Sequence, residues 1–249
     1  MTFDLSGKQA LITGANRGIG KAIALGYAKQ GADIIIVDLS INEQTKAEIE
    51  EAGVRCHCHV YDLTDCKGIS TLVQELINAH GRIDILVNNA GIQRRHDSVD
   101  FPIEDWDAVN DINAKTVFFL CQAVGRHMIE CGGGKIVNLA SLLSFQGGFR
   151  VPAYAASKGA VMQFTKSLSN EWAQHNININ CLAPGYLDTE LNTALIADPV
   201  RSRQILERIP AGRWGKPEDI AGAAVFLASS ASDYINGIVI PIDGGWLGR

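Results

Sequence analysis

Short apolar runs rich in β-branched residues recur along the whole chain, and longer amphipathic segments separate them. The runs are uninterrupted by polar residues, which is typical of strands covered on both faces of a parallel sheet. The intervening segments are long enough to be the crossover helices that a parallel sheet requires. The sequence therefore predicts an α/β fold, with strands within residues 10–13, 34–37, 54–60, 83–87, 136–139, 177–182 and 237–240.

Helical patterns cover residues 21–30, 68–80 and 106–130, and Pro217 opens a further helix. Residues 185–215 are less regular and predict a mobile flap with short helices. No linker in the 249 residues is long enough to separate two domains, and α/β folds of this length often form one unit. We therefore expect a single domain over residues 1–249.

The charge balance and the hydropathy exclude several classes of protein. Lys and Arg number 22 against 27 Asp and Glu, and the net charge of −5 argues against binding to nucleic acids or anionic membranes. No apolar run approaches the roughly 18 residues that would span a bilayer, and the first residues do not form a signal peptide. Six cysteines are sparse for this length and suit reduced thiols, so we expect a cytoplasmic protein.

One segment, Cys56-His57-Cys58-His59, has the residue types of a metal site. It lies within a predicted strand, where alternate side chains face opposite sides, so at most two of the four can share a face. The sequence has no second ligand pair at zinc spacing. We therefore expect no metal site.

A glycine-rich loop, Thr13–Gly20, follows the first predicted strand and opens the first predicted helix. Glycines in such a loop allow a tight turn and a close approach of the backbone to a pyrophosphate, which then lies at the helix N-terminus. The spacing is Gly-x-x-x-Gly-x-Gly rather than the common Gly-x-Gly-x-x-Gly. The position between strand and helix nevertheless predicts a dinucleotide site.

Asp38 ends the second predicted strand, 18 residues after Gly20. A carboxylate at this position can accept hydrogen bonds from the adenosine ribose, and it repels a 2′-phosphate. The sequence therefore favours NAD over NADP. Arg17 is the one residue that favours NADP, because a guanidinium in this loop could pair with a 2′-phosphate.

Tyr154 and Lys158 are four residues apart in a helical pattern, so both lie on one face of the helix. A free tyrosine has a pKa of about 10, and a nearby ammonium group can lower it enough to make the phenol a proton shuttle. Ser141 ends the fifth predicted strand, and ligands of open α/β sheets bind at the carboxyl ends of the strands. We expect Ser141 to meet the glycine loop and the segment Asn88–Gly91 at that edge.

Several separate motifs, in order along nearly the whole chain, make it resemble the short-chain dehydrogenase/reductase family. They are the Thr13–Gly20 loop, Asp62-Leu63, Asn88-Asn89-Ala90-Gly91, Asn113, Ser141, Tyr154 with Lys158, and Pro184-Gly185 followed by Thr189. The resemblance implies a Rossmann-type, doubly wound, seven-stranded parallel sheet flanked by helices on both faces. It also implies a homotetramer.

The resemblance further implies the roles of individual residues. Tyr154 would be the general acid/base, Lys158 would lower its pKa and hold the nicotinamide ribose, Ser141 would bind the reacting oxygen, and Asn113 would support a water relay. The residues that would contact the cofactor are Gly14, Asn16, Arg17, Gly18, Ile19, Gly20, Asp38, Asp62, Leu63, Asn89, Ala90, Gly91, Tyr154, Lys158, Pro184, Gly185, Leu187 and Thr189.

A closer resemblance is to the sugar-acid branch of this family, through stretches such as Ile92–Arg95, Leu143–Gly148 and Arg208–Gly215. It implies hydride transfer between nicotinamide and a hydroxyl or ketone of 2-deoxygluconate or 2-dehydro-3-deoxygluconate. A hydroxy acid needs a cation for its carboxylate and polar groups for its hydroxyls, and the candidates beside Ser141 are Arg94, Gln146 and Arg150.

Other functions remain open from the sequence. Gluconate or another polyol or cyclic alcohol is the alternative substrate. A reductase of 3-oxoacyl carrier proteins fits less well, because Asp38 disfavours NADPH. A dinucleotide sensor without catalysis would not need the set Asn113, Ser141, Tyr154 and Lys158.

Overall fold

The computed structural model describes residues 2–249. Its sheet has seven parallel strands in the order β3-β2-β1-β4-β5-β6-β7, so the strand order reverses between β1 and β4. The strands are β1 (Gln9–Thr13), β2 (Asp33–Asp38), β3 (Cys56–Val60), β4 (Ile85–Asn88), β5 (Gly134–Leu139), β6 (Ile177–Pro184) and β7 (Val239–Ile242). The predicted doubly wound α/β fold is confirmed.

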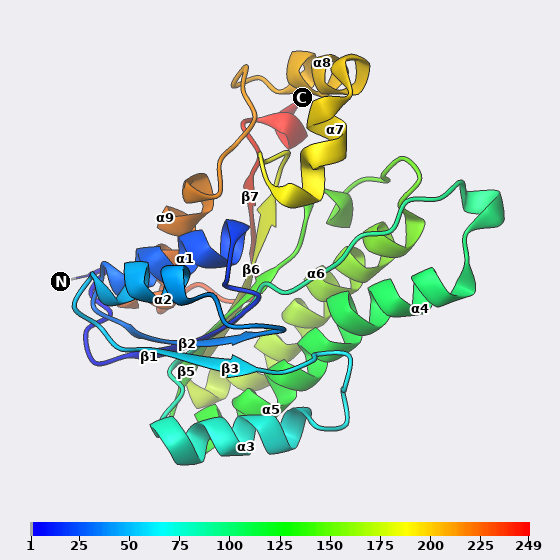
Figure 1. The fold of residues 1–249 in the computed structure, drawn as a ribbon. Coiled ribbons are helices and arrows are strands. Elements are labelled where there is room, and N and C mark those ends of the chain that lie inside the picture. Colours follow the sequence, from blue (N-terminus) through cyan, green and yellow to red (C-terminus); the bar gives the residue numbers. More distant parts are fainter. Residues whose placement is uncertain (1) are drawn as a thin grey trace.

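Helices cover both faces of this sheet, as Figure 1 shows. One face carries α1, α2 and α9, and the other carries α3, α5 and α6. The helices are α1 (Gly18–Ala28), α2 (Glu43–Glu50), α3 (Ile69–His80), α4 (Ile103–Asn110), α5 (Thr116–Glu130), α6 (Pro152–Trp172), α7 (Thr193–Ala197), α8 (Pro199–Arg208) and α9 (Glu218–Ala228).

The two faces explain why the strands are continuous apolar runs. In β2, Ile34 and Ile36 are buried in the core under α1 and α9, and Ile35 and Val37 are buried in the core under α3 and α5. Successive side chains of a strand point to opposite faces, so a strand with helices on both sides needs an apolar residue at every position.

The helix expected over residues 106–130 is interrupted, which corrects that prediction. The structure divides it into α4, a π-helical turn at Asp111–Lys115, and α5. The wider turn contains Asn113, which is fully buried and bonds the main chain of Ile92. A π turn inserts one residue into a helix and often marks a functional site, but the periodicity of side chains does not reveal it.

Residues 185–215 contain the short helices that the sequence predicts, α7 and α8. Asp198 begins α8 by accepting hydrogen bonds from the main-chain N–H groups of Val200 and Arg201. In Figure 1 these helices lie beyond the carboxyl ends of the strands, close to the C-terminus. Within residues 2–249, no helix has both the length and the apolar character needed to cross a bilayer.

Candidate active site

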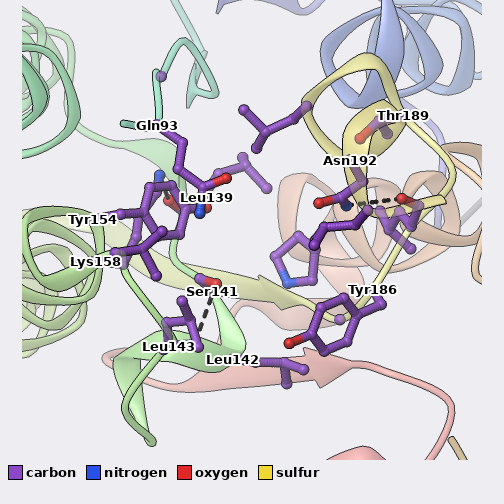
Figure 2. Close-up of a pocket in the computed structure, with 18 of the residues that line it drawn as sticks. Gln93, Leu139, Ser141, Leu142, Leu143, Tyr154, Lys158, Tyr186, Thr189 and Asn192 are labelled. Carbon is purple, nitrogen blue, oxygen red and sulfur yellow. Dashed lines mark hydrogen bonds between the residues drawn. The ribbon is translucent and has the colours of Figure 1, made fainter. Parts of the chain in front are cut away.

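A pocket lies at the carboxyl ends of the central strands, and ten residues of the predicted site line it. Figure 2 shows Tyr154, Lys158 and Ser141 near one another, and Thr189, Asn192 and Tyr186 across the pocket from Tyr154 and Lys158. The predicted residues in the lining are Ile19, Asn89, Gly91, Ser141, Tyr154, Lys158, Pro184, Gly185, Leu187 and Thr189. The switch point between β1 and β4 is where open α/β sheets bind ligands.

The glycine loop has a backbone that side chains would disturb. Gly14 and Gly18 have φ values of +66° and +56°, which lie in the left-handed region. A Cβ on Gly20 would lie 2.5 Å from Nδ2 of Asn89. Helix α1 begins at Gly18 without a side-chain cap and without an acidic residue in its first turn. Its free N–H groups therefore fit the pyrophosphate of a dinucleotide.

Hydrogen bonds of Asn16 connect this loop to the end of β2. Its Nδ2 donates to the Ser40 carbonyl at 2.7 Å, and its main-chain N–H donates to Oδ2 of Asp38 at 3.1 Å. Oδ1 of Asp38 accepts from the N–H of Leu39 at 2.8 Å. The buried Oδ1 of Asn16 has no hydrogen-bond partner among residues 2–249, so the loop retains an acceptor that a bound ligand could satisfy.

Arg17 is exposed and forms an ion pair with a residue of the flap. Its guanidinium pairs with Glu190 at 2.5 Å, and about three quarters of the arginine side chain is exposed, at 74%. Glu190 follows Thr189 in the flap, so the ion pair joins the glycine loop to the flap. Exposed ion pairs stabilise a fold by only about 0–1 kcal/mol, so this one can open easily.

The segment after β4 is tied to the glycine loop. Nδ2 of Asn89 donates to the carbonyls of Thr13 and Gly14 at 3.0 and 2.9 Å. Ala90 donates its N–H to the Thr13 hydroxyl at 3.1 Å. Asp62 and Leu63 lie further along the edge of the sheet: the Asp62 carboxylate accepts from Thr64, and Leu63 is buried in the core. Neither residue lines the pocket.

Ser141, Tyr154 and Lys158 are brought together by β5 and α6. Ser141 caps a short 3₁₀ turn, Leu142–Ser144, and its Oγ accepts from the N–H of Leu143 at 3.2 Å. Nζ of Lys158 donates to the Leu139 carbonyl at 2.6 Å and lies 5.7 Å from the centre of the Tyr154 ring. Ser141 and Lys158 are both buried, with 8% and 5% of their surfaces exposed.

The electrostatics of this group differ from the expectation that Lys158 lowers the pKa of Tyr154. Burial raises the pKa of Tyr154, while the Ser141 side chain and the charge of Arg95 lower it. Burial also lowers the pKa of Lys158 to about 8. The ammonium is directed at a carbonyl, and its own charge is disfavoured, so in this structure Ser141 and Arg95 are the groups that favour the phenolate.

Asn113 lies behind the pocket rather than in its lining. Its Oδ1 accepts from the Ile92 N–H, and its Nδ2 donates to the Ile92 carbonyl, both at 2.8 Å. The same Nδ2 lies 3.2 Å from Oγ of Ser157, which donates to the Tyr154 carbonyl. The amide therefore links the segment after β4 to the helix that carries Tyr154.

Three expected substrate residues lie outside the pocket. Arg94 pairs with Asp105 at 3.2 Å, and Arg150 pairs with Asp97 at 3.0 Å. Gln146 accepts a hydrogen bond from Arg208 at 3.4 Å. None of the three lines the pocket, because each faces a neighbouring loop or helix. Of the four residues expected to bind the substrate, only Ser141 lines it.

The pocket contains two other arginines, Arg95 and Arg201, and neither forms a salt bridge with a carboxylate of residues 2–249. Gly91, Gln93 and Arg95 all line the pocket, as alternate residues of an extended segment do. That alternation could have identified Arg95 instead of Arg94 from the sequence. Arg201 comes from α8, together with Tyr186 and Asn192 from the flap, and no motif identifies these three.

The cluster at β3 has the alternation expected of a strand. His57 and His59 both contact His80 of α3: the rings of His57 and His80 stack at 4.3 Å, and the Nε2 atoms of His59 and His80 are 2.7 Å apart. Burial and the neighbouring charges lower the pKa values of His59 and His80. The part of the chain that the structure describes holds no group of three residues placed to bind a metal.

Comparisons with known proteins agree with this geometry. A family model described as enoyl-(acyl carrier protein) reductase matches residues 14–247. The 2-dehydro-3-deoxy-D-gluconate 5-dehydrogenase of Dickeya dadantii (strain 3937) is 53% identical over 249 residues, which cover 100% of this chain and 98% of that protein.

Solved structures of related proteins have the same fold. The structure of a putative 2-deoxy-D-gluconate 3-dehydrogenase from Agrobacterium tumefaciens with bound NADP has a TM-score of 0.94 and 49% identity, covering 100% of this chain and 99% of that one. The structure of a gluconate 5-dehydrogenase from Burkholderia cenocepacia in complex with NADP and tartrate has a TM-score of 0.95 and 43% identity, covering 100% and 98%. The matching family model, the full-length relatives and the fold together show that this chain belongs to the short-chain dehydrogenase/reductase family.

Proposed function

We propose that this protein is an NAD-dependent oxidoreductase of a deoxy-keto sugar acid, 2-dehydro-3-deoxy-D-gluconate or 2-deoxy-D-gluconate. The observation that carries the proposal is one pocket that holds Ser141, Tyr154 and Lys158 together with two arginines that lack a carboxylate partner. The names of the full-length relatives support the same substrates. The proposal also treats residues 1–249 as one domain with a mobile flap at residues 185–215.

In the proposed mechanism, a bound nicotinamide would supply or accept the hydride, and the protein positions the substrate and moves the proton. Tyr154 gives its phenolic proton to the carbonyl oxygen during reduction, and the phenolate takes the proton back from the alcohol during oxidation. Ser141 holds the same oxygen by a hydrogen bond. Burial raises the pKa of Tyr154, and Ser141 and Arg95 oppose that rise, so they favour the phenolate that oxidation requires.

Lys158 and the glycine loop would hold the cofactor. The buried ammonium donates to the Leu139 carbonyl at the end of β5, and its remaining N–H groups would donate to the nicotinamide ribose. The free N–H groups at the N-terminus of α1 would bind the pyrophosphate, and the spare acceptor Oδ1 of Asn16 would accept a hydrogen bond from a cofactor hydroxyl. Asn113 would support the proton path by fixing the segment after β4.

The two arginines of the pocket support an acidic substrate. Each carries a positive charge, and burial and the charge of Arg201 both lower the pKa of Arg95, so the two cations repel one another. A carboxylate between them would relieve that repulsion and would accept charge-assisted hydrogen bonds. Gln93 and Asn192 supply neutral donors and acceptors for sugar hydroxyls.

For the cofactor we propose NAD rather than NADP. The Asp38 carboxylate is held at the end of β2 by the N–H groups of Asn16 and Leu39, where a 2′-phosphate would meet its negative charge. Arg17 is paired with Glu190 rather than directed at Asp38. The bound NADP in the related structures is a property of those proteins, and the choice in this chain needs a direct test.

The experiment is a panel of substrates assayed with NAD⁺ and NADP⁺ in parallel, read by the absorbance of the reduced nicotinamide. The panel contains 2-dehydro-3-deoxygluconate, 2-deoxygluconate, gluconate and simple polyols. The highest kcat/KM should belong to a deoxy sugar acid with NAD⁺. Gluconate is the second candidate, because a gluconate 5-dehydrogenase has the same fold at 43% identity. Turnover of the polyols alone would reject the acid-binding pocket.

We also propose that the protein works as a cytoplasmic homotetramer, and the family resemblance is the support for this assembly. Light scattering of the purified protein should then give the mass of four chains. A monomer in that measurement would reject the assembly without affecting the proposed reaction.

A further inference from the structure

The Ser144 hydroxyl joins the two elements that carry the proposed catalytic residues. Ser144 ends the 3₁₀ turn that begins after Ser141, and its Oγ accepts the main-chain N–H of Ser141 at 3.3 Å. The same Oγ donates to the main-chain carbonyl of Lys158 at 2.7 Å. One hydroxyl therefore connects the turn that follows β5 to the helix α6.

A second bond connects the same two elements in the opposite sense. Nζ of Lys158 donates to the carbonyl of Leu139 at the end of β5, at 2.6 Å. Together these three hydrogen bonds fix the main chain of Ser141 and both the main chain and the side chain of Lys158. The Oγ of Ser141 is oriented by the hydrogen bond that it accepts from the N–H of Leu143. Figure 2 shows the resulting arrangement of Ser141 beside Tyr154 and Lys158.

We propose that Ser144 is a positioning residue, which sets the distance between the Ser141 hydroxyl and the Tyr154 phenol. The inference rests on the proposed function, in which these two hydroxyls share the reacting oxygen. Ser144 does not line the pocket, so its effect must pass through Ser141 and α6. Without its hydroxyl, the N–H of Ser141 would lose its partner and the turn would be free to shift from α6.

A shift of Ser141 has a consequence for the titration of Tyr154. The groups that affect the pKa of the phenol are Ser141 from the turn and Arg95 from the segment after β4, and the ammonium of Lys158 lies 5.7 Å from the centre of its ring. Burial raises the pKa of Tyr154, and the interaction with Ser141 opposes that rise. Loss of the interaction should therefore raise the pKa of Tyr154 further. Because the phenolate is the form that takes the proton during NAD⁺-dependent oxidation, the rising limb of the pH profile of kcat should move to higher pH.

The test compares Ser144→Ala with Ser144→Thr, which keeps a hydroxyl, and with Ser169→Ala. Ser169 is a matched control, because its Oγ also donates to a carbonyl of α6, that of Lys166 at 2.8 Å, far along the helix from the pocket. All variants are assayed on the substrate that the wild type turns over best. NADH affinity is measured separately by fluorescence.

Loss of one hydrogen bond of about 1 kcal/mol should lower kcat about fivefold in Ser144→Ala, with KM and the NADH affinity within about twofold of wild type. With NAD⁺, the rising limb of the pH profile of kcat should move to higher pH, and Ser144→Thr and Ser169→Ala should keep the wild-type kcat and pH profile. A wild-type kcat and pH profile in Ser144→Ala would overturn the proposal. A Ser144→Thr variant as impaired as Ser144→Ala, or an equal loss in Ser169→Ala, would also overturn it.

A measurement that does not depend on turnover, the pKa of Tyr154, tests the role of Ser144 separately from the proposed function. The ionisation of Tyr154 is followed by near-ultraviolet absorbance, as the difference between each protein and the same protein with Tyr154→Phe. Ser144→Ala should ionise at higher pH than the wild type, whether or not a sugar acid is the substrate. Identical titrations would reject the positioning role even if the substrate panel succeeds.

Discussion

The two walls of the pocket are built differently. The wall that carries Ser141 and Lys158 is buried, and hydrogen bonds to the main chain fix each of these side chains. The opposite wall is carried by the flap, where α7 has no buried residue and α8 has only Ile205. The first wall is therefore held by the core of the fold, and the second by a few apolar contacts.

Those few contacts come from the end of the chain. Ile205 and Ile209 pack with Leu142 and the C-terminal Trp246 in a small separate core. The ring of Trp246 contacts Tyr186 at 4.7 Å and lies under the guanidinium of Arg208 at 4.0 Å. The difference between the walls indicates that the groups proposed for proton transfer are preorganised, whereas the groups that would recognise the substrate are held by fewer buried contacts.

The largest effect should follow from removal of one oxygen atom from the buried wall. Tyr154→Phe keeps the ring but removes the proposed proton donor, and general acid/base catalysis contributes roughly 10²–10⁴-fold. We expect kcat to fall about 10³-fold while the affinity for NADH, measured by fluorescence, stays within a few-fold of wild type. Retention of near-normal turnover would show that the phenol is not the proton shuttle.

The same variant distinguishes an enzyme from a dinucleotide sensor. A sensor needs the cofactor site but no proton transfer, so its ligand binding and any output would be unaffected by Tyr154→Phe. Measurement of both turnover and NADH binding on the one variant therefore separates the two functions.

A second large effect should come from the glycine loop, which belongs to the buried side of the site. A Cβ in Gly20→Ala would lie 2.5 Å from Nδ2 of Asn89, and such overpacking costs about 1–3 kcal/mol or more. The dissociation constant of NADH should rise up to about 100-fold by titration calorimetry. Gly222→Ala is the control, because a Cβ there meets nothing within 4 Å, and it should leave binding unchanged.

The next effect concerns two neighbouring arginines of the segment after β4, one inside the pocket and one outside it. Arg95→Ala removes a charge that lines the pocket, whereas Arg94→Ala removes one that pairs with Asp105. Because Arg95 is partly exposed to water, we expect about a tenfold rise in KM for the sugar acid, near the lower limit for a charged hydrogen bond. The KM for an uncharged ketone should change much less. A larger rise in KM for the sugar acid in Arg94→Ala than in Arg95→Ala would show that Arg94, not Arg95, binds the carboxylate.

Most of the fold and of the buried wall could be predicted from the sequence, because both depend on local patterns. Buried parallel strands must be apolar at every position, as β2 is, and the glycine loop must lie between a strand and a helix. Tyr154 and Lys158 share a helix face by their spacing alone. These features need no knowledge of distant contacts.

The contacts that bring flap residues into the pocket, and the charge states of the site residues, could not be predicted in the same way. Arg201 reaches the pocket because α8 packs on Trp246, some 45 residues later in the chain, and no local pattern encodes that contact. The π turn at Asn113 and the desolvation of Lys158 likewise depend on what surrounds each residue after folding. A spacing places two side chains on one face, but burial decides which of them is charged.

The smallest effect should be a change in the pH dependence of stability, which tests whether burial lowers the pKa of Lys158. An unfolded lysine keeps its proton up to a pH near 10.5, whereas burial lowers the pKa of folded Lys158 to about 8. Between these two values the unfolded chain binds more protons than the folded one, so this residue should make the free energy of unfolding increase with pH. The increase should be about 1 kcal/mol per pH unit just above pH 8, relative to Lys158→Met, in urea unfolding followed by circular dichroism. Tyr154 is present in both proteins, so its own titration largely cancels in the comparison. Parallel pH dependences in the two proteins would mean that Lys158 keeps an ordinary pKa, and the buried wall would then be more hydrated than its low exposure indicates.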